Sequence, residues 1–400
     1  MSEDAQNNED QQNSTTQANT TAHTPPKNQE IDNTTTKTAL NIDPTRNKNF
    51  ALSTQQQADR LTKLANTLDD LGDSKGAITR YTQALTLYEQ LPHATEGHAK
   101  CLYNLALTLT RTGDRQGAIK HYTQALGVYQ QLPHTTEQQA DCFTNLANTL
   151  HRTGRHKEAL DRFTQALTLY EQLPHATENH ADCLNNLATT LLNLDRHKEA
   201  IKHYTQALGL YQQLPHATEN HANCLNNLAL ALDGIGESEK AIERYTQALG
   251  LYQQLPHATE NHAICLASLA NTLRIGESEK AIERYTQALG VFEQLPHATE
   301  NHAACLYNLA TTLLNLGRHK EAIKHYTQAL GLYQQLPHAT EDHAACLYNL
   351  ATTFLNLGRP EEALERYTQA LALFEQLPHA TEDHANCLNN LALALDGIGE

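Results

Sequence analysis

The sequence predicts an all-α fold, a solenoid of antiparallel helix pairs that follows a disordered N-terminal tail. Two observations lead to this prediction. From Leu52 onward one pattern recurs eight times, and each copy contains two stretches with the apolar period of an amphipathic helix. Residues 1–50 instead consist mostly of Asn, Gln, Thr, Asp and Glu, which cannot form an apolar core. We therefore expect a tail at residues 1–50 and an array at residues 51–400, with eight helix pairs and one unpaired final helix.

The composition limits the partners and the compartment that can be expected. The 400 residues include 45 acidic and 29 basic side chains, and the resulting net charge of -16 argues against binding of nucleic acid. No apolar run is long enough for a membrane span, and the first residues have neither the basic start nor the apolar centre of a secretory signal. These features predict a cytoplasmic protein without a membrane span.

An aromatic residue in front of "TQAL" marks each copy of the repeat. Successive copies are 41 residues apart, except for one interval of 40. The aromatic residues are Tyr81, Tyr122, Phe163, Tyr204, Tyr245, Tyr285, Tyr326 and Tyr367. In one copy, apolar residues of helical period are Leu306, Leu309, Ala310 and Leu313, then Ala322, Ile323, Tyr326, Ala329, Leu330 and Tyr333. Each unit is therefore predicted to be a pair of amphipathic helices.

Turn and cap residues separate the predicted helices. Gly317 lies between the two helices of its unit, and Pro337 ends the second helix because proline lacks the amide that a helix interior needs. Thr340 is expected to cap the next helix. At the start of the array, Ser53 and Gln56 have the spacing of a capping box, so the first helix is expected to begin there.

The order of small and large residues within each unit resembles the tetratricopeptide repeat. The stretch "CLYNLATTLLNLGRHKEAIKHYTQALGLY" carries the resemblance at Leu306, Leu309, Ala310, Leu313, Gly317, Ala322, Tyr326 and Ala329. The usual unit has about 34 residues, whereas this one has 41, and the longer unit is most similar to the kinesin light chain type. The resemblance implies a right-handed superhelix whose concave groove binds a protein or peptide.

Eight cysteines stand at the same point of successive predicted first helices. They are Cys101, Cys142, Cys183, Cys224, Cys265, Cys305, Cys346 and Cys387. Stacked helices are about 8 to 10 Å apart, whereas a disulfide needs Cα atoms within about 7 Å. We therefore interpret the cysteines as reduced packing groups. His221 is interpreted as a helix-start residue over the buried thiol of Cys224. A metal site at this pair stays a minor alternative, since neighbouring units are too distant to complete a structural zinc site.

An asparagine column marks the candidate binding groove. Its members are Asn104, Asn145, Asn186, Asn227, Asn308, Asn349 and Asn390, with Ser268 as the exception. An exposed asparagine offers a donor and an acceptor, which match the needs of an extended peptide backbone. In the family that the array resembles, groove asparagines hold the backbone of a bound peptide in this way, and the resemblance implies the same role here. The alternative is that these amides hydrogen-bond neighbouring helices.

Three variable columns lie along the same side of the first helix, which lines the groove in tetratricopeptide arrays. The first column holds Lys100, Asp141, Asp182, Asn223, Ile264, Ala304, Ala345 and Asn386. The second holds Tyr103, Thr144, Asn185, Asn226, Ala267, Tyr307, Tyr348 and Asn389. The third holds Leu107, Asn148, Thr189, Leu230, Asn271, Thr311, Thr352 and Leu393. From these columns we select as groove residues Asp141, Asp182, Asn185, Asn226, Tyr307 and Tyr348, and the two aspartates predict a preference for basic peptide residues. The alternative is relaxed drift of an exposed face.

Two irregularities interrupt the repeat. The interval from Tyr245 to Tyr285 is one residue short, and either the loop absorbs the change or the array bends there. At the far end, Cys387–Glu400 is identical to Cys224–Glu237, but the earlier copy continues into a second helix. We infer a chain cut from a longer one, with a natural end that dimerises through the last helix as the alternative.

These features predict a non-catalytic scaffold or adaptor that binds an extended peptide in the groove. The sequence lacks a Gly-rich phosphate loop, a nucleophile elbow and a separate pair of carboxylates, so the array is predicted not to be an enzyme or to need a cofactor. The alternative is a partner-sensing arm of a larger signalling enzyme or NTPase whose catalytic domain lies beyond residue 400. The sequence does not identify the partner.

Overall fold

The computed structural model describes residues 44–134, 137–175, 177–215, 218–297, 299–336, 341–377 and 381–398, and in these ranges the regular structure is entirely α-helical. The helices are α1 (Pro44–Asp70), α2 (Ser74–Tyr88), α3 (Glu96–Thr112), α4 (Arg115–Tyr129), α5 (Glu137–Arg152), α6 (His156–Tyr170), α7 (Glu178–Leu192), α8 (His197–Tyr211), α9 (Glu219–Asp233), α10 (Ser238–Tyr252), α11 (Glu260–Leu273), α12 (Ser278–Phe292), α13 (Glu300–Asn315), α14 (His319–Tyr333), α15 (Glu341–Asn356), α16 (Pro360–Phe374) and α17 (Glu382–Ile398). None of the described helices combines the length and apolar character that a bilayer crossing needs.

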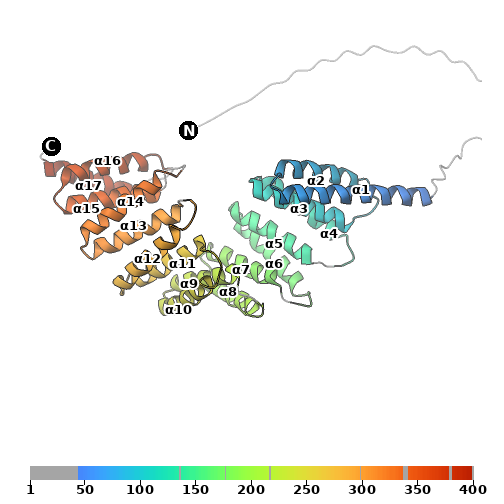
Figure 1. The fold of residues 1–400 in the computed structure, drawn as a ribbon, viewed down its shortest axis with the longest axis horizontal. Coiled ribbons are helices and arrows are strands. Elements are labelled where there is room, and N and C mark those ends of the chain that lie inside the picture. The colour runs from blue at the N-terminus through green and yellow to red at the C-terminus, as the bar shows by residue number, and fades with distance from the viewer. Residues whose placement is uncertain are drawn as a thin grey trace, which may run out of the picture. The chain divides into compact units, whose positions relative to one another are not determined.

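The helices of the array from Ala51 onward pack in pairs along the chain (Figure 1). The odd-numbered helices are called first helices below and the even-numbered ones second helices. From α3 to α15 each first helix packs against the second helix that follows it, and each second helix packs against the next first helix. Consecutive first helices from α3 to α17 also contact one another, whereas no such contact joins consecutive second helices in the described ranges. This nearest-neighbour packing confirms the predicted solenoid of helix pairs. The predicted right-handed sense of a superhelix stays a prediction.

The first helices begin at threonine caps, but the start of the array differs from the prediction. Thr95 accepts a hydrogen bond from the backbone N–H of His98 at 3.1 Å, and the equivalent threonine caps α7, α9, α11 and α13. Pro337 and Thr340, predicted to end and begin helices, lie outside the described residues. The predicted start at Ser53 is wrong, because α1 begins at Pro44 and Ser53 lies in its interior. Proline is favoured at the first position of a helix, and no breaker follows it before Ser53.

A left-handed residue ends the turn between the two helices of a unit. Gly317 has a φ of 73°, which confirms its predicted place between α13 and α14, because glycine adopts this region without a steric penalty. The unit of α7 and α8 has Asp195 at the equivalent position, with a φ of 56°. An aspartate tolerates this conformation better than most residues, but it still costs more than glycine.

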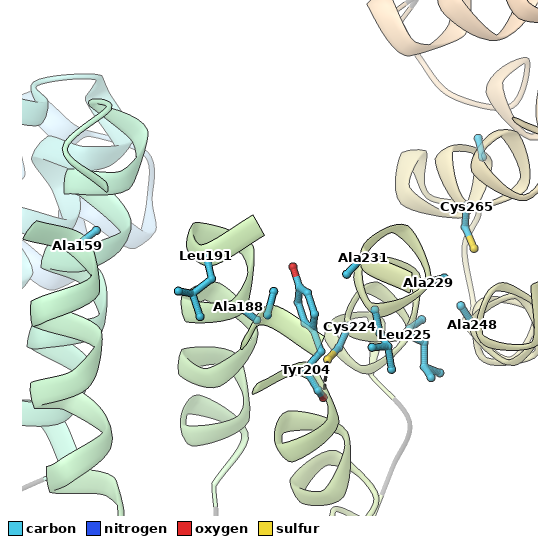
Figure 2. Packing of buried hydrophobic residues seen from close by; sticks show 14 of the residues in the cluster. Ala159, Ala188, Leu191, Tyr204, Cys224, Leu225, Ala229, Ala231, Ala248 and Cys265 are labelled. Atoms are coloured by element: carbon cyan, nitrogen blue, oxygen red, sulfur yellow. Dashed lines mark hydrogen bonds between the residues drawn. The ribbon is translucent and has the colours of Figure 1, made fainter. Parts of the chain in front are cut away.

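Small residues allow close packing within and between units. Ala188 of α7 and Ala200 of α8 are completely buried, so the two helices of this unit approach closely. Between units, the Sγ of Cys224 in α9 lies 3.7 Å from the carbonyl oxygen of Tyr204 in α8 and donates a weak hydrogen bond to it (Figure 2). All eight cysteines are buried, free thiols, and each makes the same contact with the preceding unit. The structure thus confirms them as packing groups.

The short unit keeps its core in register because the loop absorbs the missing residue. Leu273 near the end of α11 and Ala281 in α12 are buried, as are the equivalent Leu232 and Ala241 in the preceding unit. The change is confined to the turn between α11 and α12, where the side chain of Ile275 is 88% exposed. Of the two predicted outcomes, absorption by the loop is therefore the one that the structure shows at this turn.

The final helix α17 exposes residues that its earlier copy buries. Leu388 is 49% exposed, whereas Leu225 at the identical position of α9 is 5% exposed. The helix α9 is followed by α10, which packs against it. In the described part of the chain, α17 has contacts with α16 and α15 alone.

Candidate functional site

The first helices line a row of surface cavities. One cavity, of about 970 Å³, is lined by residues of α1 to α5 and of α7, and these residues include Asn66, Asn104, Asn145 and Asn186. A second cavity of about 450 Å³ is lined by residues of α7, α9 and α11. A third, of about 140 Å³, lies on α3, α5 and α7 beside them and shares Asn186 with both. The cavities are lined mainly by amide and hydroxyl side chains, and Asn104, Asn145, Asn186 and Asn227 of the candidate asparagine column lie at their walls.

The asparagines of this column are half-buried rather than exposed, and most bind the preceding unit. The Nδ2 of Asn145 donates to the hydroxyl of Tyr103 at 2.9 Å, and the Nδ2 of Asn349 donates to the hydroxyl of Tyr307 at 2.7 Å. Further bonds of this kind join Asn104 to Asn66, Asn227 to Asn185 and Asn390 to Tyr348. The asparagine amide therefore links consecutive first helices, as the alternative interpretation proposed, while the Oδ1 of each of these asparagines except Asn227, which accepts from Asn226, stays available as an acceptor.

Two members of the asparagine column lack this bond to the preceding unit. For Asn186 the equivalent partner position is Thr144, whose hydroxyl donates to the Ala140 carbonyl instead. For Asn308 it is Ala267, which has no polar group. The amide Nδ2 groups of Asn186 and Asn308 therefore make no hydrogen bond within the described residues, and both amides can use donor and acceptor towards a ligand.

The first variable column changes together with a buried aromatic residue at the end of the second helix. The hydroxyls of Tyr88, Tyr170, Tyr211 and Tyr252 donate to Asp59, Asp141, Asp182 and Asn223. Where the column is Ile264 or Ala345, the aromatic residue is Phe292 or Phe374, which needs no acceptor. Where it is Lys100 or Ala304, the hydroxyls of Tyr129 and Tyr333 are buried and have no partner among the described residues. The column is thus tied to internal packing, which the sequence analysis missed although the paired changes are visible in it.

The third variable column is tied in the same way to the tyrosine in front of "TQAL". The hydroxyls of Thr189 and Tyr204 lie 2.9 Å apart, and equivalent pairs join Thr311 to Tyr326 and Thr352 to Tyr367. Phe163 replaces the tyrosine in the unit of Asn148, so this asparagine makes no such bond and lines two of the cavities. The threonines of this column are thus engaged in hydrogen bonds within their own units, whereas Asn148 has no such bond to make.

The two selected aspartates already hold hydrogen bonds within the array. The Oδ1 of Asp141 accepts from the Tyr170 hydroxyl at 2.5 Å and from the Nδ2 of Asn179 at 3.1 Å. Asp182 accepts from Tyr211 and Asn220 in the same manner. Burial raises the pKa of both carboxyl groups, although the hydrogen bonds that they accept act in the opposite direction. Both line cavities, so the predicted preference for a basic ligand stays a prediction.

The histidines near the start of the first helices stack on the preceding unit. The ring of His221 lies parallel to that of Tyr211, with centroids 5.4 Å apart, and six further histidines stack on the equivalent Tyr or Phe. Burial lowers the pKa of His221, because the charged imidazolium loses hydration there. The His221 ring and the Cys224 thiol thus have separate packing partners. In the described ranges no three His, Cys, Asp or Glu side chains are grouped as a metal site requires.

Models of the tetratricopeptide repeat match most of the array. One matches residues 96–172, 180–254, 302–376 and 345–400, and another matches residues 144–215. No curated protein matches the chain.

Several solved structures are similar to the chain at low sequence identity. A tetratricopeptide repeat protein from Parabacteroides merdae is 16% identical, with a TM-score of 0.52, and the match covers 75% of this chain and 99% of that one. A Signal Transduction ATPase with Numerous Domains (STAND) protein with a tetratricopeptide repeat sensor, from Pyrococcus horikoshii, is 15% identical, with a TM-score of 0.60. That match covers 81% of this chain and 49% of the other. A Podospora anserina putative kinesin light chain with nearly identical repeats is 17% identical, with a TM-score of 0.42 over 48% of this chain and 93% of that one.

Proposed function

The chain belongs to the tetratricopeptide repeat family, and we propose that it is a scaffold or adaptor that binds an extended segment of a partner protein along its first helices. The observation that carries the proposal is the asparagine column, of which Asn104, Asn145, Asn186 and Asn227 line the cavities. Most of its amides use Nδ2 to hold the preceding unit and keep Oδ1 as an acceptor. A row of fixed acceptors matches the N–H groups of an extended backbone, whatever its side chains are.

The proposal assigns no chemical step to the array. The groups that catalysis would use are engaged in packing, because the thiols lie on backbone carbonyls and the histidine rings stack on aromatic rings. We place the protein in the cytoplasm, in keeping with eight buried thiols that form no disulfide. Self-association through α17, whose Leu388 is exposed, is a further proposal.

The test is to select random phage-displayed peptides on the array and to measure several unrelated ones by fluorescence anisotropy. Replacing Asn186, Asn227, Asn308 and Asn349 together by alanine should weaken all of them, because each lost hydrogen bond costs about 0.5–1.5 kcal/mol. The control carries Gln213→Ala and Gln335→Ala, whose side chains donate to carbonyls of their own second helices. Equal affinity of the asparagine variant and the wild type would remove the column from the binding site.

A sensing arm of a larger signalling ATPase is a second candidate. It is favoured by the likeness to the STAND protein from Pyrococcus horikoshii, whose tetratricopeptide repeat is named a sensor and of which about half is matched. That likeness shows the fold alone. Sequencing the transcript past the codon for Glu400 separates the candidates. A following nucleotide-binding motif would favour the sensing arm, whereas further repeat units and a stop codon would leave the scaffold.

A further inference from the structure

The cavity on α7, α9 and α11, called the asparagine pocket below, differs from the rest of the groove in its chemistry. It has a volume of about 450 Å³, and Asp182 is its one charged lining residue. The polar residues that carry the following inference are Asp182, Asn185, Asn186, Asn220, Asn226 and Asn227. Because these side chains come from consecutive units, a single group in the pocket can reach several of them.

A buried acceptor of this pocket has no donor. Asn226 is 7% exposed, and its Nδ2 donates to the Oδ1 of Asn227 at 3.4 Å. Its Oδ1 is buried and receives no hydrogen bond from the described residues. Leaving a buried acceptor without a partner is unfavourable, because its hydration is lost and not replaced. Because the Asn226 side chain lines the pocket, a rotation of its amide lets an incoming group supply the missing donor.

The carboxylate of Asp182 also lacks a cation. Its oxygens accept from the hydroxyl of Tyr211 and the Nδ2 of Asn220, and each oxygen can accept one more hydrogen bond. No Lys, Arg or His in the part of the chain that the structure describes forms an ion pair with it. A half-buried carboxylate without a cation is stabilised by a ligand that brings a positive charge.

We propose that the asparagine pocket binds an arginine side chain of the partner segment, with Asp182 and the Oδ1 of Asn226 as acceptors. The inference rests on the proposed function and names the ligand chemistry of one part of that site. A guanidinium has donors alone, and its planar fork can address two acceptors at once, whereas a lysine ammonium is a compact point charge. The net charge of -16 draws a cationic segment towards the array.

The chain itself supplies conservative variants for the test. Asn223 occupies the position of Asp182 in the next unit and still accepts from its tyrosine, so Asp182→Asn removes the charge and keeps the packing bond. Ala267 occupies the position of Asn226 in the unit after that, so Asn226→Ala is also a substitution that the array already contains. The control is Asn389→Ala in α17, at an exposed position of the same column outside the pocket.

The experiment selects random phage-displayed peptides on the wild-type array and on each variant, and reads the frequency of arginine in the selected peptides. One selected peptide is then synthesised with arginine or with citrulline, the neutral analogue of the same shape. On the wild type and on Asn389→Ala, we expect arginine to be enriched and to bind on the order of tenfold more tightly than citrulline. On Asp182→Asn the enrichment and the preference should be lost, and on Asn226→Ala both peptides should bind more weakly.

The outcomes separate the inference from the proposed function. Peptides without arginine enrichment, or an enrichment that Asp182→Asn leaves unchanged, would overturn the arginine site while the groove function stands. Failure to select any peptide on the folded wild-type array would overturn both. Circular dichroism of each variant before selection ensures that lost binding does not come from lost helix.

Discussion

Replacing Tyr333 by phenylalanine is expected to stabilise the array, whereas the same replacement at Tyr252 is expected to destabilise it. Both tyrosines are 2% exposed and end the second helix of their unit. The hydroxyl of Tyr252 donates to Asn223, but the buried hydroxyl of Tyr333 has no partner among the residues that the structure describes, because Ala304 takes the place of that asparagine. The two positions therefore differ in the state of a single hydroxyl group.

The expected sizes follow from this difference. Tyr252→Phe loses a hydrogen bond and leaves the Asn223 amide without its donor, at a cost of about 1–2 kcal/mol of unfolding free energy. Tyr333→Phe removes a hydroxyl that is buried without a hydrogen bond among the described residues, and should raise the free energy of unfolding by on the order of 1 kcal/mol. Ala304→Asn tests the same reasoning in the opposite direction. It places an acceptor for the Tyr333 hydroxyl at the position that Asn223 occupies opposite Tyr252.

Urea unfolding followed by circular dichroism measures the effect. The variants are compared by the urea concentration at the midpoint of unfolding. An unchanged slope of the unfolding free energy against urea concentration shows that each variant exposes the same amount of surface when it unfolds. The urea midpoint should be highest for Tyr333→Phe, intermediate for the wild type and lowest for Tyr252→Phe. Equal losses for the two phenylalanine variants would refute the reasoning, because they would mean that the Tyr333 hydroxyl is as well satisfied as that of Tyr252.

Three further predictions concern the turn, the histidines and the thiols. Asp195→Gly should raise the unfolding free energy by about 1 kcal/mol, since glycine adopts the left-handed φ of 56° freely. Gly317→Ala should lower the unfolding free energy by a similar amount, and urea midpoints measure both changes. The array should lose stability as the pH falls below about 6.5, because burial holds the pKa of the stacked histidines below that of the unfolded chain, so that unfolding takes up protons. His221→Gln, which copies Gln139 of another unit, should reduce this pH dependence in urea titrations between pH 5 and pH 7.5, and an unchanged dependence would assign it to other groups. Burial raises the pKa of the Cys101 thiol to about 11. Iodoacetamide at pH 8 should therefore label the eight buried thiols in denaturant and spare them in the folded array, as adducts counted by mass spectrometry will show. Rapid labelling of the folded protein would contradict the packing role.

The helix pairs were predictable because a single sequence contains many copies of the pattern. Chance matches to a helical period average out over repeats, and Gly317 marks the turn that every unit shares. The start of α1 was mispredicted because Ser53 and Gln56 have a capping spacing that a helix interior can also contain. The helix-starting preference of Pro44, with no breaker between it and Ser53, was the competing local signal.

The groove was harder to predict because sequence variation does not tell exposure from internal pairing. Tyr170 with Asp141 and Phe374 with Ala345 are paired changes some thirty residues apart, and the contact that explains the pairing is seen only when the second helix is packed against the first. The stacking of His221 on Tyr211 was missed for the same reason, since the residues belong to different units.

The same pairing narrows the search for residues that set ligand preference. A side chain that already satisfies a buried tyrosine or a neighbouring helix cannot change freely, so its variation is constrained by the array as well as by a ligand. Asn148 stands opposite Phe163, and Asn308 stands opposite Ala267, so neither has an internal polar partner at that position. Both can change without cost to the packing. We therefore expect Asn148→Ala and Asn308→Ala to alter peptide affinity with little change in stability, whereas replacing Asn145, which binds Tyr103, should alter both.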